Sequence, residues 1–193
     1  MTGPKRLCVV RIRNEPFQPA DYQPAVQGIF EMKLPRGARL GPVEKKAISN
    51  LAILNEAYHY PKPSSFSRGM RIDLGGFAIL LISGTASIDE EGRTVHTGDF
   101  REQTRRTFRN ITSLLEAEGA RWEDIVRTTC YLRDIDRDYD AFNEERTAFY
   151  ESQKLNPLPA STAVQAHLCR PELLVEIEAI GMFRTDPDAP PAS

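Results

Sequence analysis

The chain has 193 residues, 40% of them hydrophobic, and a formal net charge of −2, which suits one folded domain with an extension. This charge balance gives no general attraction to nucleic acid or to an anionic membrane, so a nucleic-acid partner is not expected. No apolar run approaches the ~20 residues that cross a bilayer, and the first residues lack a signal peptide's apolar core. We therefore expect a cytoplasmic protein with no membrane association.

The chain divides into three regions by composition. Residues 1–56 read as an irregular extension with many prolines, a strand at residues 7–13 and a short helix over residues 42–56. Residues 57–184 carry the regular patterns of a folded domain. Residues 185–193 have too few apolar side chains to offset the entropy of ordering and are predicted to form a mobile tail.

Within the folded domain the elements follow in a simple order. Two short strands around Gly75-Gly76 predict a hairpin, with Gly84 ending its second strand. A helix then begins at the N-cap Asp99 and stops at Gly119. One strand, one further helix and two more strands follow, at residues 125–133, 137–153, 162–168 and 173–183.

Side-chain spacing predicts which faces of these elements are buried. The first helix carries a stripe at steps of three and four residues, made of Phe100, Thr104, Phe108, Ile111 and Leu115. The strand after it alternates a core face with a face rich in hydrogen-bond donors. The core face is Val126, Thr128, Cys130 and Leu132, and the other is Arg127, Thr129, Tyr131 and Arg133.

This element order predicts an α+β fold, in which two helices pack on one face of a mixed sheet. The other sheet face then has no cover within the chain. Burial against a second copy is the usual solution, so we expect an oligomer.

Two acids interrupt the apolar run of the last strand. Because strand side chains alternate with period two, Glu176 and Glu178 point to the same face, among Leu174, Ile180 and Met182. A carboxylate among apolar neighbours is a candidate for a raised pKa and for proton transfer. An edge strand whose acids face solvent or pair with arginines is the alternative from the pattern alone.

The three cysteines, Cys8, Cys130 and Cys169, are far apart and suggest free thiols in a reducing compartment. The three histidines are equally scattered, so no metal site is expected.

The domain resembles the Rid/YjgF family, also called endoribonuclease L-PSP, over about residues 57–184. The matching segments include residues 82–87, 98–99, 124–126, 142–143 and 175–180. The resemblance implies a chorismate-mutase-like homotrimer with ligand clefts between subunits. It also implies hydrolysis of enamines or imines of small carboxylate metabolites without a cofactor.

Carried over by position, the family's cleft falls on an aromatic lid, a strand-end pair, a helix asparagine and a glutamate that positions water. These are Phe66, Ser83, Gly84, Asn143 and Glu176. The arginine that grips the substrate carboxylate in deaminating members is replaced by Ser161, and a hydroxyl is no substitute for a bidentate guanidinium. Arg170 is the most natural replacement.

The segments at residues 83–87, 96–99 and 169–178 also resemble the C-terminal half of chorismatases, which hydrolyse chorismate. That resemblance implies Glu176 as the proton donor, with Tyr131, Arg133 and Arg170 holding ligand carboxylates. Chorismatases are longer, with a further fold-like N-terminal half, whereas about 56 irregular residues stand in front of the domain in this sequence.

Structural roles compete with each of these assignments. Ser83 and Gly84 can simply end a strand, Asn143 can lie at an interface, and Phe66 can be a hydrophobic plug. Arg133 and Arg170 are expected to pair with Glu176, Glu178 or aspartates, and Cys169 lacks the base that a nucleophile needs. The run Arg101, Arg105, Arg106 and Arg109 is predicted to be a solvated helix face laced with Glu102 and Glu116.

The leading functional hypothesis is hydrolysis in intersubunit clefts built around Ser83, Asn143, Arg170 and Glu176. The alternative from another class is a non-catalytic small-molecule sensor or interaction module that uses the same cleft.

Overall fold

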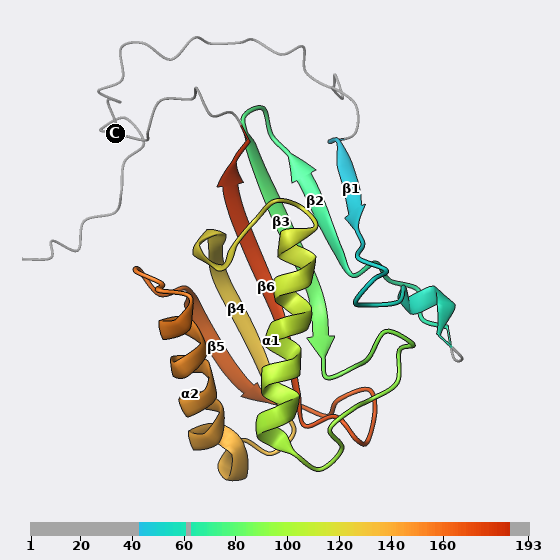
Figure 1. The fold of residues 1–193 in the computed structure, drawn as a ribbon, viewed down its shortest axis with the longest axis vertical. Coiled ribbons are helices and arrows are strands. Elements are labelled where there is room, and N and C mark those ends of the chain that lie inside the picture. Colours follow the sequence, from blue (N-terminus) through green and yellow to red (C-terminus); the bar gives the residue numbers. More distant parts are fainter. Residues whose placement is uncertain (1–42, 61–62, 186–193) are drawn as a thin grey trace, which may run out of the picture. The chain divides into compact units, whose positions relative to one another are not determined.

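Within the described residues, the chain folds into a six-stranded mixed sheet and two α-helices (Figure 1). The computed structural model describes residues 43–60 and 63–185. The predicted strand at residues 7–13 and most of the predicted tail lie outside the described residues. The strand order is β1-β2-β3-β6-β4-β5, antiparallel throughout except for the parallel pair β4 and β5. The predicted α+β class and mixed sheet are confirmed.

The element bounds follow the sequence prediction closely in the domain's second half. The strands are β1 Lys45–Ile48, β2 Gly69–Asp73, β3 Phe77–Ala86, β4 Ile125–Leu132, β5 Ala160–Gln165 and β6 Val175–Arg184. The helices are α1 Phe100–Glu116 and α2 Ile135–Ser152, with short 3-10 turns at Ala57–His59 and Trp122–Asp124.

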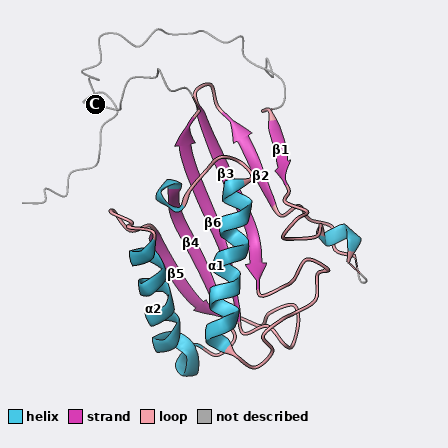
Figure 2. Cartoon of the chain, in the orientation of Figure 1, coloured by secondary structure: helices cyan, strands magenta, loops and turns pink. Residues whose placement is uncertain are grey.

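Both helices lie on one face of the sheet (Figure 2). Asp99 caps α1 by accepting a hydrogen bond from the backbone N–H of Glu102, as predicted. The five predicted stripe residues of α1 are all buried, and Phe108 and Ile111 are essentially inaccessible. The apolar stripe therefore does place α1 on the sheet.

The predicted helix at residues 42–56 is wrong. Residues 45–48 instead form the edge strand β1, which pairs with β2 from Lys45 opposite Ile72 to Ile48 opposite Gly69. Burial of Ile48 and the ladder hydrogen bonds outweigh the local preference, which tertiary contacts commonly override. β1 thus adds a strand from the segment assigned to the N-terminal extension.

Two strand irregularities also differ from expectation. β3 does not end at Gly84 but continues to Ala86 past a register shift between Ile82 and Thr85. A second shift between Ile125 and Arg127 turns Val126 outward, where it is 48% exposed, and puts Ile125 in the core. A β-bulge adds one residue to a strand and so reverses which side chains face inward. The core assignment of Val126 is wrong for this reason.

The sheet face opposite the helices carries a row of exposed apolar side chains. Leu81, Val126, Val164 and Met182 are each between 37% and 48% exposed. Apolar side chains gathered on one exposed sheet face favour an interaction surface.

Candidate functional site

A cavity of about 470 Å³ lies beside the ends of β3 and β6. Six of the predicted site residues line it, namely Phe66, Ser83, Gly84, Cys169, Arg170 and Glu176. The remaining lining residues are Tyr60, Ser64, Arg68, Ala86, Ile88, Leu173 and Glu178. The cavity therefore combines two acids, two arginines and an apolar wall, which is typical of a small-molecule site.

Glu176 packs directly over Gly84. A Cβ atom added at Gly84 would lie 2.0 Å from the carboxylate oxygen Oε1 of Glu176 and 2.9 Å from its carboxyl carbon. Any side chain at residue 84 would displace the Glu176 carboxyl group. Glycine is thus required at residue 84 because Glu176 packs against it, and not because the strand ends there.

The Glu176 side chain forms no hydrogen bond or ion pair with another described residue within normal distances. Burial raises the pKa of Glu176, and the neighbouring Glu178 carboxylate raises it further. Both acids share one face of β6, as predicted, while Val175, Ile177 and Ala179 are buried on the other. The cavity consequently contains a carboxyl group that holds its proton at higher pH than an ordinary glutamate.

Tyr131 lies on β4 directly opposite Glu176 in the strand register. Burial raises the pKa of Tyr131, and its hydrogen bond with Glu178 raises it further. Tyr131 is not among the residues that line the cavity, so it acts on the site through Glu178.

Ser83 holds the segment that forms the cavity's outer wall. Its hydroxyl donates to the carbonyl of Ser67 at 2.8 Å, and its backbone N–H donates to the carbonyl of Arg68 at 3.0 Å. Phe66, 41% exposed, stands on this segment beside the Arg68 guanidinium. Ser83 therefore positions the aromatic residue that was predicted to cover the cleft.

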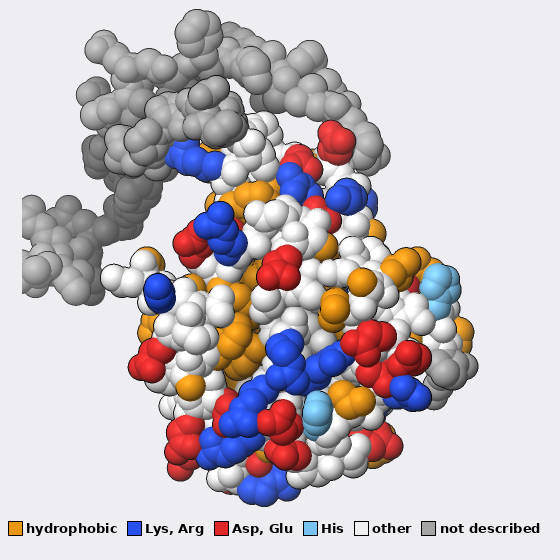
Figure 3. All heavy atoms as spheres, in the orientation of Figure 1, with side chains coloured by type: hydrophobic (Ala, Val, Ile, Leu, Met, Phe, Trp, Pro, Cys, Tyr) orange, Lys and Arg blue, Asp and Glu red, His pale blue; other side chains and the backbone are white. Residues whose placement is uncertain are grey.

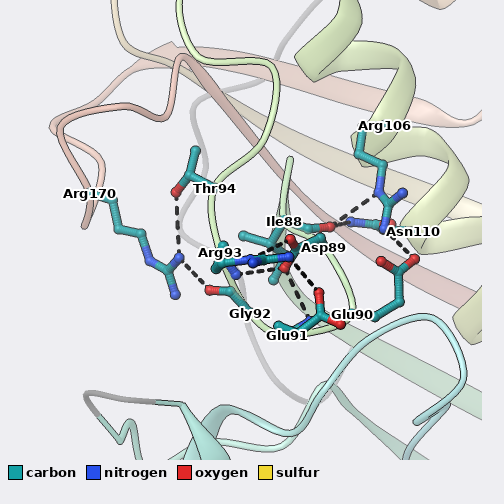
Figure 4. Close-up of polar contacts among 10 residues, drawn as sticks. All are labelled: Ile88, Asp89, Glu90, Glu91, Gly92, Arg93, Thr94, Arg106, Asn110 and Arg170. Carbon is teal, nitrogen blue, oxygen red and sulfur yellow. Dashed lines mark hydrogen bonds and ion pairs between the residues drawn. The ribbon is translucent and has the colours of Figure 1, made fainter.

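Arg170 reaches from the loop before β6 to the loop at residues 88–94 (Figure 4). Its Nη1 donates to the carbonyl of Gly92 at 2.7 Å, with Thr94 Oγ1 at 3.4 Å. The expected ion pairs of Arg170 with Glu176 or Glu178 do not form in the described chain.

Helix α1 fixes the opposite side of that loop. The Asn110 side chain donates to the carbonyl of Ile88, and Arg106 donates to the same carbonyl and pairs with Glu90 (Figure 4). Asn110 also donates to the carbonyl of Ala86. Asn110 is fully buried and acts here as a structural bracket for the cavity wall.

Arg133 has a different role from either prediction. Its guanidinium donates to the carbonyl oxygens of Leu173 and Arg170, and it does not line the cavity. The predicted pairing of Arg133 with Glu176 or Glu178 is wrong, because the loop carbonyls before β6 lie closer. Arg133 supports the loop that carries Arg170.

Asn143 and Ser161 are not brought to Glu176 within one chain. Each lines a hollow of its own on the helical side of the domain. Arg146 on α2 joins them, since its guanidinium contacts the Asn143 amide oxygen and donates to Ser161 Oγ at 3.1 Å. A guanidinium from the helix therefore stands at the hydroxyl where the family resemblance expects one from the strand.

Cys169 is exposed at the cavity, whereas Cys130 is buried between Thr128 and Ser161. Burial raises the pKa of the Cys130 thiol. Among residues 43–60 and 63–185, no group of three His, Cys, Asp or Glu side chains is placed to hold a metal ion. In the same ranges no helix combines the length and apolar character needed to span a membrane.

The comparison with known proteins identifies the family. The model of the family described as Endoribonuclease L-PSP matches residues 62–183, which is more than half of the chain. The chain belongs to this family. The Rid/YjgF resemblance of the sequence is confirmed.

Relatives and solved structures agree with this assignment. RutC family proteins from Pyrococcus abyssi and Pyrococcus horikoshii are each 34% identical over 121 residues, covering 62% of this chain and 88% and 89% of theirs. The YjgF gene product of E. coli is 26% identical with a TM-score of 0.55, covering 70% of this chain and 97% of that one. The Rid protein YyfA of Yersinia pestis is 26% identical with a TM-score of 0.56, covering 72% and 98%.

Three residues that the structure places at the Glu176 cavity or beside Ser161 were not identified from the sequence. Tyr60 and Arg68 line the cavity, and Arg146 contacts Ser161. Tyr60 and Arg68 flank a proline-broken stretch that was interpreted as a loop. Arg68 lies two residues after Phe66, and that proximity is the signal that would have suggested it. Nothing in the spacing of Arg146 distinguishes it from the other exposed arginines of the helices.

Proposed function

We propose that this protein hydrolyses a reactive imine or enamine carboxylate in the cavity beside Gly84, with Glu176 as the acid. One observation carries the proposal: the Glu176 carboxyl group lies in the cavity over a glycine, with a raised pKa and without a hydrogen-bond or ion-pair partner among the described residues. A carboxyl group that keeps its proton at higher pH than an ordinary glutamate is suited to donate that proton to a substrate.

The chemistry needs one water molecule and no cofactor. Protonated Glu176 gives its proton to the imine nitrogen as water adds to the imine carbon. The resulting carboxylate takes a proton from the added water, which leaves a neutral carbinolamine. Glu176 then gives this proton to the amine nitrogen and takes the remaining hydroxyl proton as the carbon–nitrogen bond breaks. Ammonia and an oxo acid leave, and Glu176 returns to its protonated state.

Trimeric assembly is part of the same proposal. Both helices cover one sheet face, and the exposed apolar row on the other face supports burial against further copies (Figure 1). The predicted intersubunit cleft would add Asn143 and the Arg146–Ser161 pair of one subunit to the Glu176 cavity of the next. Native mass spectrometry tests this, and a monomer would contradict it.

The direct test is turnover of a 2-imino acid generated in place by an amino-acid oxidase, measured as ammonia release above the spontaneous rate. Wild type is expected to accelerate release, and Glu176→Gln to lose the acceleration by about 100-fold or more. Glu116→Gln, an exposed acid on α1 away from the cavity, is the matched control. If Glu176→Gln works as fast as wild type, Glu176 is not the acid.

Chorismatase-like hydrolysis is the second candidate. The presence of two guanidinium groups, those of Arg68 and Arg170, in one cavity with Glu176 favours it, because chorismate carries two carboxylates. Incubation with chorismate distinguishes the candidates through the product. Saturable binding of carboxylates without turnover of either substrate would instead favour a sensor.

A further inference from the structure

Two arginines face the ring of Tyr60 at one end of the cavity. The guanidinium carbon of Arg68 lies 4.9 Å from the ring centroid, and that of Arg170 lies 5.1 Å from it. The two guanidinium carbons are consequently no more than about 10 Å apart. All three side chains line the same cavity as Glu176.

The local backbone holds this group in place. Gly92 has a φ of +79°, and a Cβ there would lie 2.2 Å from Cε1 of Tyr60, so only glycine lets the ring and the loop meet. Arg170 then fastens the same loop by donating to the Gly92 carbonyl (Figure 4). The ring and the guanidinium are therefore fixed before any ligand arrives, which lowers the entropic cost of binding.

Each guanidinium is only partly used by the protein. Arg68 donates through Nε and Nη2 to the carbonyl of Asn55, which leaves Nη1 without an acceptor among the described residues. Arg170 uses Nη1 in the same described part of the chain, which leaves its Nε and Nη2. No carboxylate oxygen of the described residues lies within 4.0 Å of either arginine's nitrogen atoms, the distance that defines an ion pair.

The electrostatic surroundings of Arg68 favour the binding of an anion. Arg68 is 2% exposed, and burial together with the positive charge of Arg170 lowers its pKa. Glu56 opposes this effect with its negative charge, but it forms no ion pair with Arg68, and its Oε1 atom is buried without a hydrogen-bond partner. A buried charge in contact only with neutral acceptors is stabilised strongly by a bound counter-charge.

The other walls set the size of the ligand. Phe66 and the apolar residues Ala86, Ile88 and Leu173 line the rest of the cavity of about 470 Å³. A volume in this range accommodates a ligand well beyond a three-carbon acid, which would leave most of the apolar wall in contact with water. A flat or branched apolar group is what the aromatic and aliphatic walls would bury.

We infer that Arg68 and Arg170 form the carboxylate subsite of this cavity, and that the ligand is a carboxylate with a large apolar or ring-bearing side chain. This assignment rests on the proposed use of the same cavity for hydrolysis. The carboxylate accepts from the free N–H groups of the arginines, and the apolar group lies against Phe66 and Leu173. The unsaturated carbon then lies between the arginines and Glu176.

A binding experiment tests this without requiring turnover. Isothermal titration with phenylpyruvate, pyruvate and the methyl ester of phenylpyruvate separates the contributions of the ring and the charge. Phenylpyruvate is expected to bind about tenfold or more tightly than either of the others. Equal affinity for pyruvate would overturn the size assignment, and equal affinity for the ester would overturn the carboxylate subsite.

Substitutions test which arginines bind the carboxylate of the ligand. Arg170→Gln and Arg68→Gln are each expected to weaken phenylpyruvate binding by about tenfold or more and to leave the ester unchanged. Arg170→Lys should recover part of the loss, because it keeps the charge but not the planar fork. Arg109→Gln, which removes an exposed guanidinium on α1, is the matched control. Unchanged affinity of the folded Arg170→Gln variant would overturn the assignment.

The two proposals fail separately. Loss of turnover in Glu176→Gln with intact phenylpyruvate binding supports both. Binding that depends on the arginines in a protein without turnover contradicts the hydrolase but keeps the subsite. Turnover that depends on Glu176 but not on the arginines contradicts the subsite alone.

Discussion

Arginines and acids gather in two regions of this molecule, and they behave differently in each. On the helical face, Arg101 and Arg105 of α1 both pair with Glu145 of α2, at 3.0 and 2.7 Å. Figure 3 shows positive and negative side chains next to one another on the lower part of that face. In the cavity, Arg68, Arg170 and Glu176 lie close together without an ion pair among them. The ion pairs on the helical face stabilise the fold. The cavity charges, which form no ion pair with one another, are available to bind a ligand.

The largest expected effect comes from removing the space that Glu176 occupies. Gly84→Ala places a methyl group where the Glu176 carboxyl group now lies, so the acid must move and turnover is expected to fall by about 100-fold. Steady-state kinetics on the folded variant measure this.

Gly181→Ala is the matched control, since it lies on the same strand as Glu176. Its added methyl group would meet only ordinary contacts, beginning at 3.4 Å from Ile125. Equal activity in Gly84→Ala and Gly181→Ala would contradict the packing argument.

The helical face is expected to respond in stability and not in activity. Glu145→Gln removes the shared partner of two arginines and should lower the melting temperature by about 2–4 °C, with kcat/KM unchanged. Glu144→Gln removes only an exposed pair with Arg101 and should change the melting temperature less. A loss of turnover in the folded Glu145→Gln variant would break the distinction between the two regions.

The smallest expected effect is a pH dependence of stability. Because the pKa of Glu176 is raised in the folded state, the folded protein holds a proton that the unfolded chain releases above its ordinary glutamate pKa. The stabilisation is present below that pKa and is lost as pH rises through the raised value. Glu176→Gln should therefore gain free energy of unfolding relative to wild type as pH rises above the ordinary glutamate pKa, until Glu176 is ionised in the folded chain as well.

Chemical denaturation of both proteins at each pH measures that difference. A constant offset between wild type and Glu176→Gln would mean that Glu176 titrates alike in the folded and unfolded chain.

Much of the fold could be predicted because its signals are local. The stripe of α1, the cap at Asp99 and the alternation of β6 each depend on residues within one element. β1 and the outward turn of Val126 could not be predicted, since one depends on pairing with β2 and the other on a bulge against β6.

The candidate site shows the same division. Glu176 and Gly84 were predicted, and both line the cavity. The interpretation of Gly84 was incomplete, however, because its reason is contact with a residue 92 positions later. Arg68 and Tyr60 were missed because the role of a loop side chain depends on tertiary contacts, which the local sequence does not specify.

The central claim is that Glu176, which has no hydrogen-bond or ion-pair partner among the described residues, is an acid whose raised pKa serves catalysis. Titration of its side-chain carboxyl carbon by ¹³C NMR tests this most directly, beside the pH dependence of kcat/KM. We expect the Glu176 signal to titrate above the ordinary glutamate range, and kcat/KM to fall as pH rises through the same value. A Glu176 signal that titrates like an exposed glutamate would contradict the account.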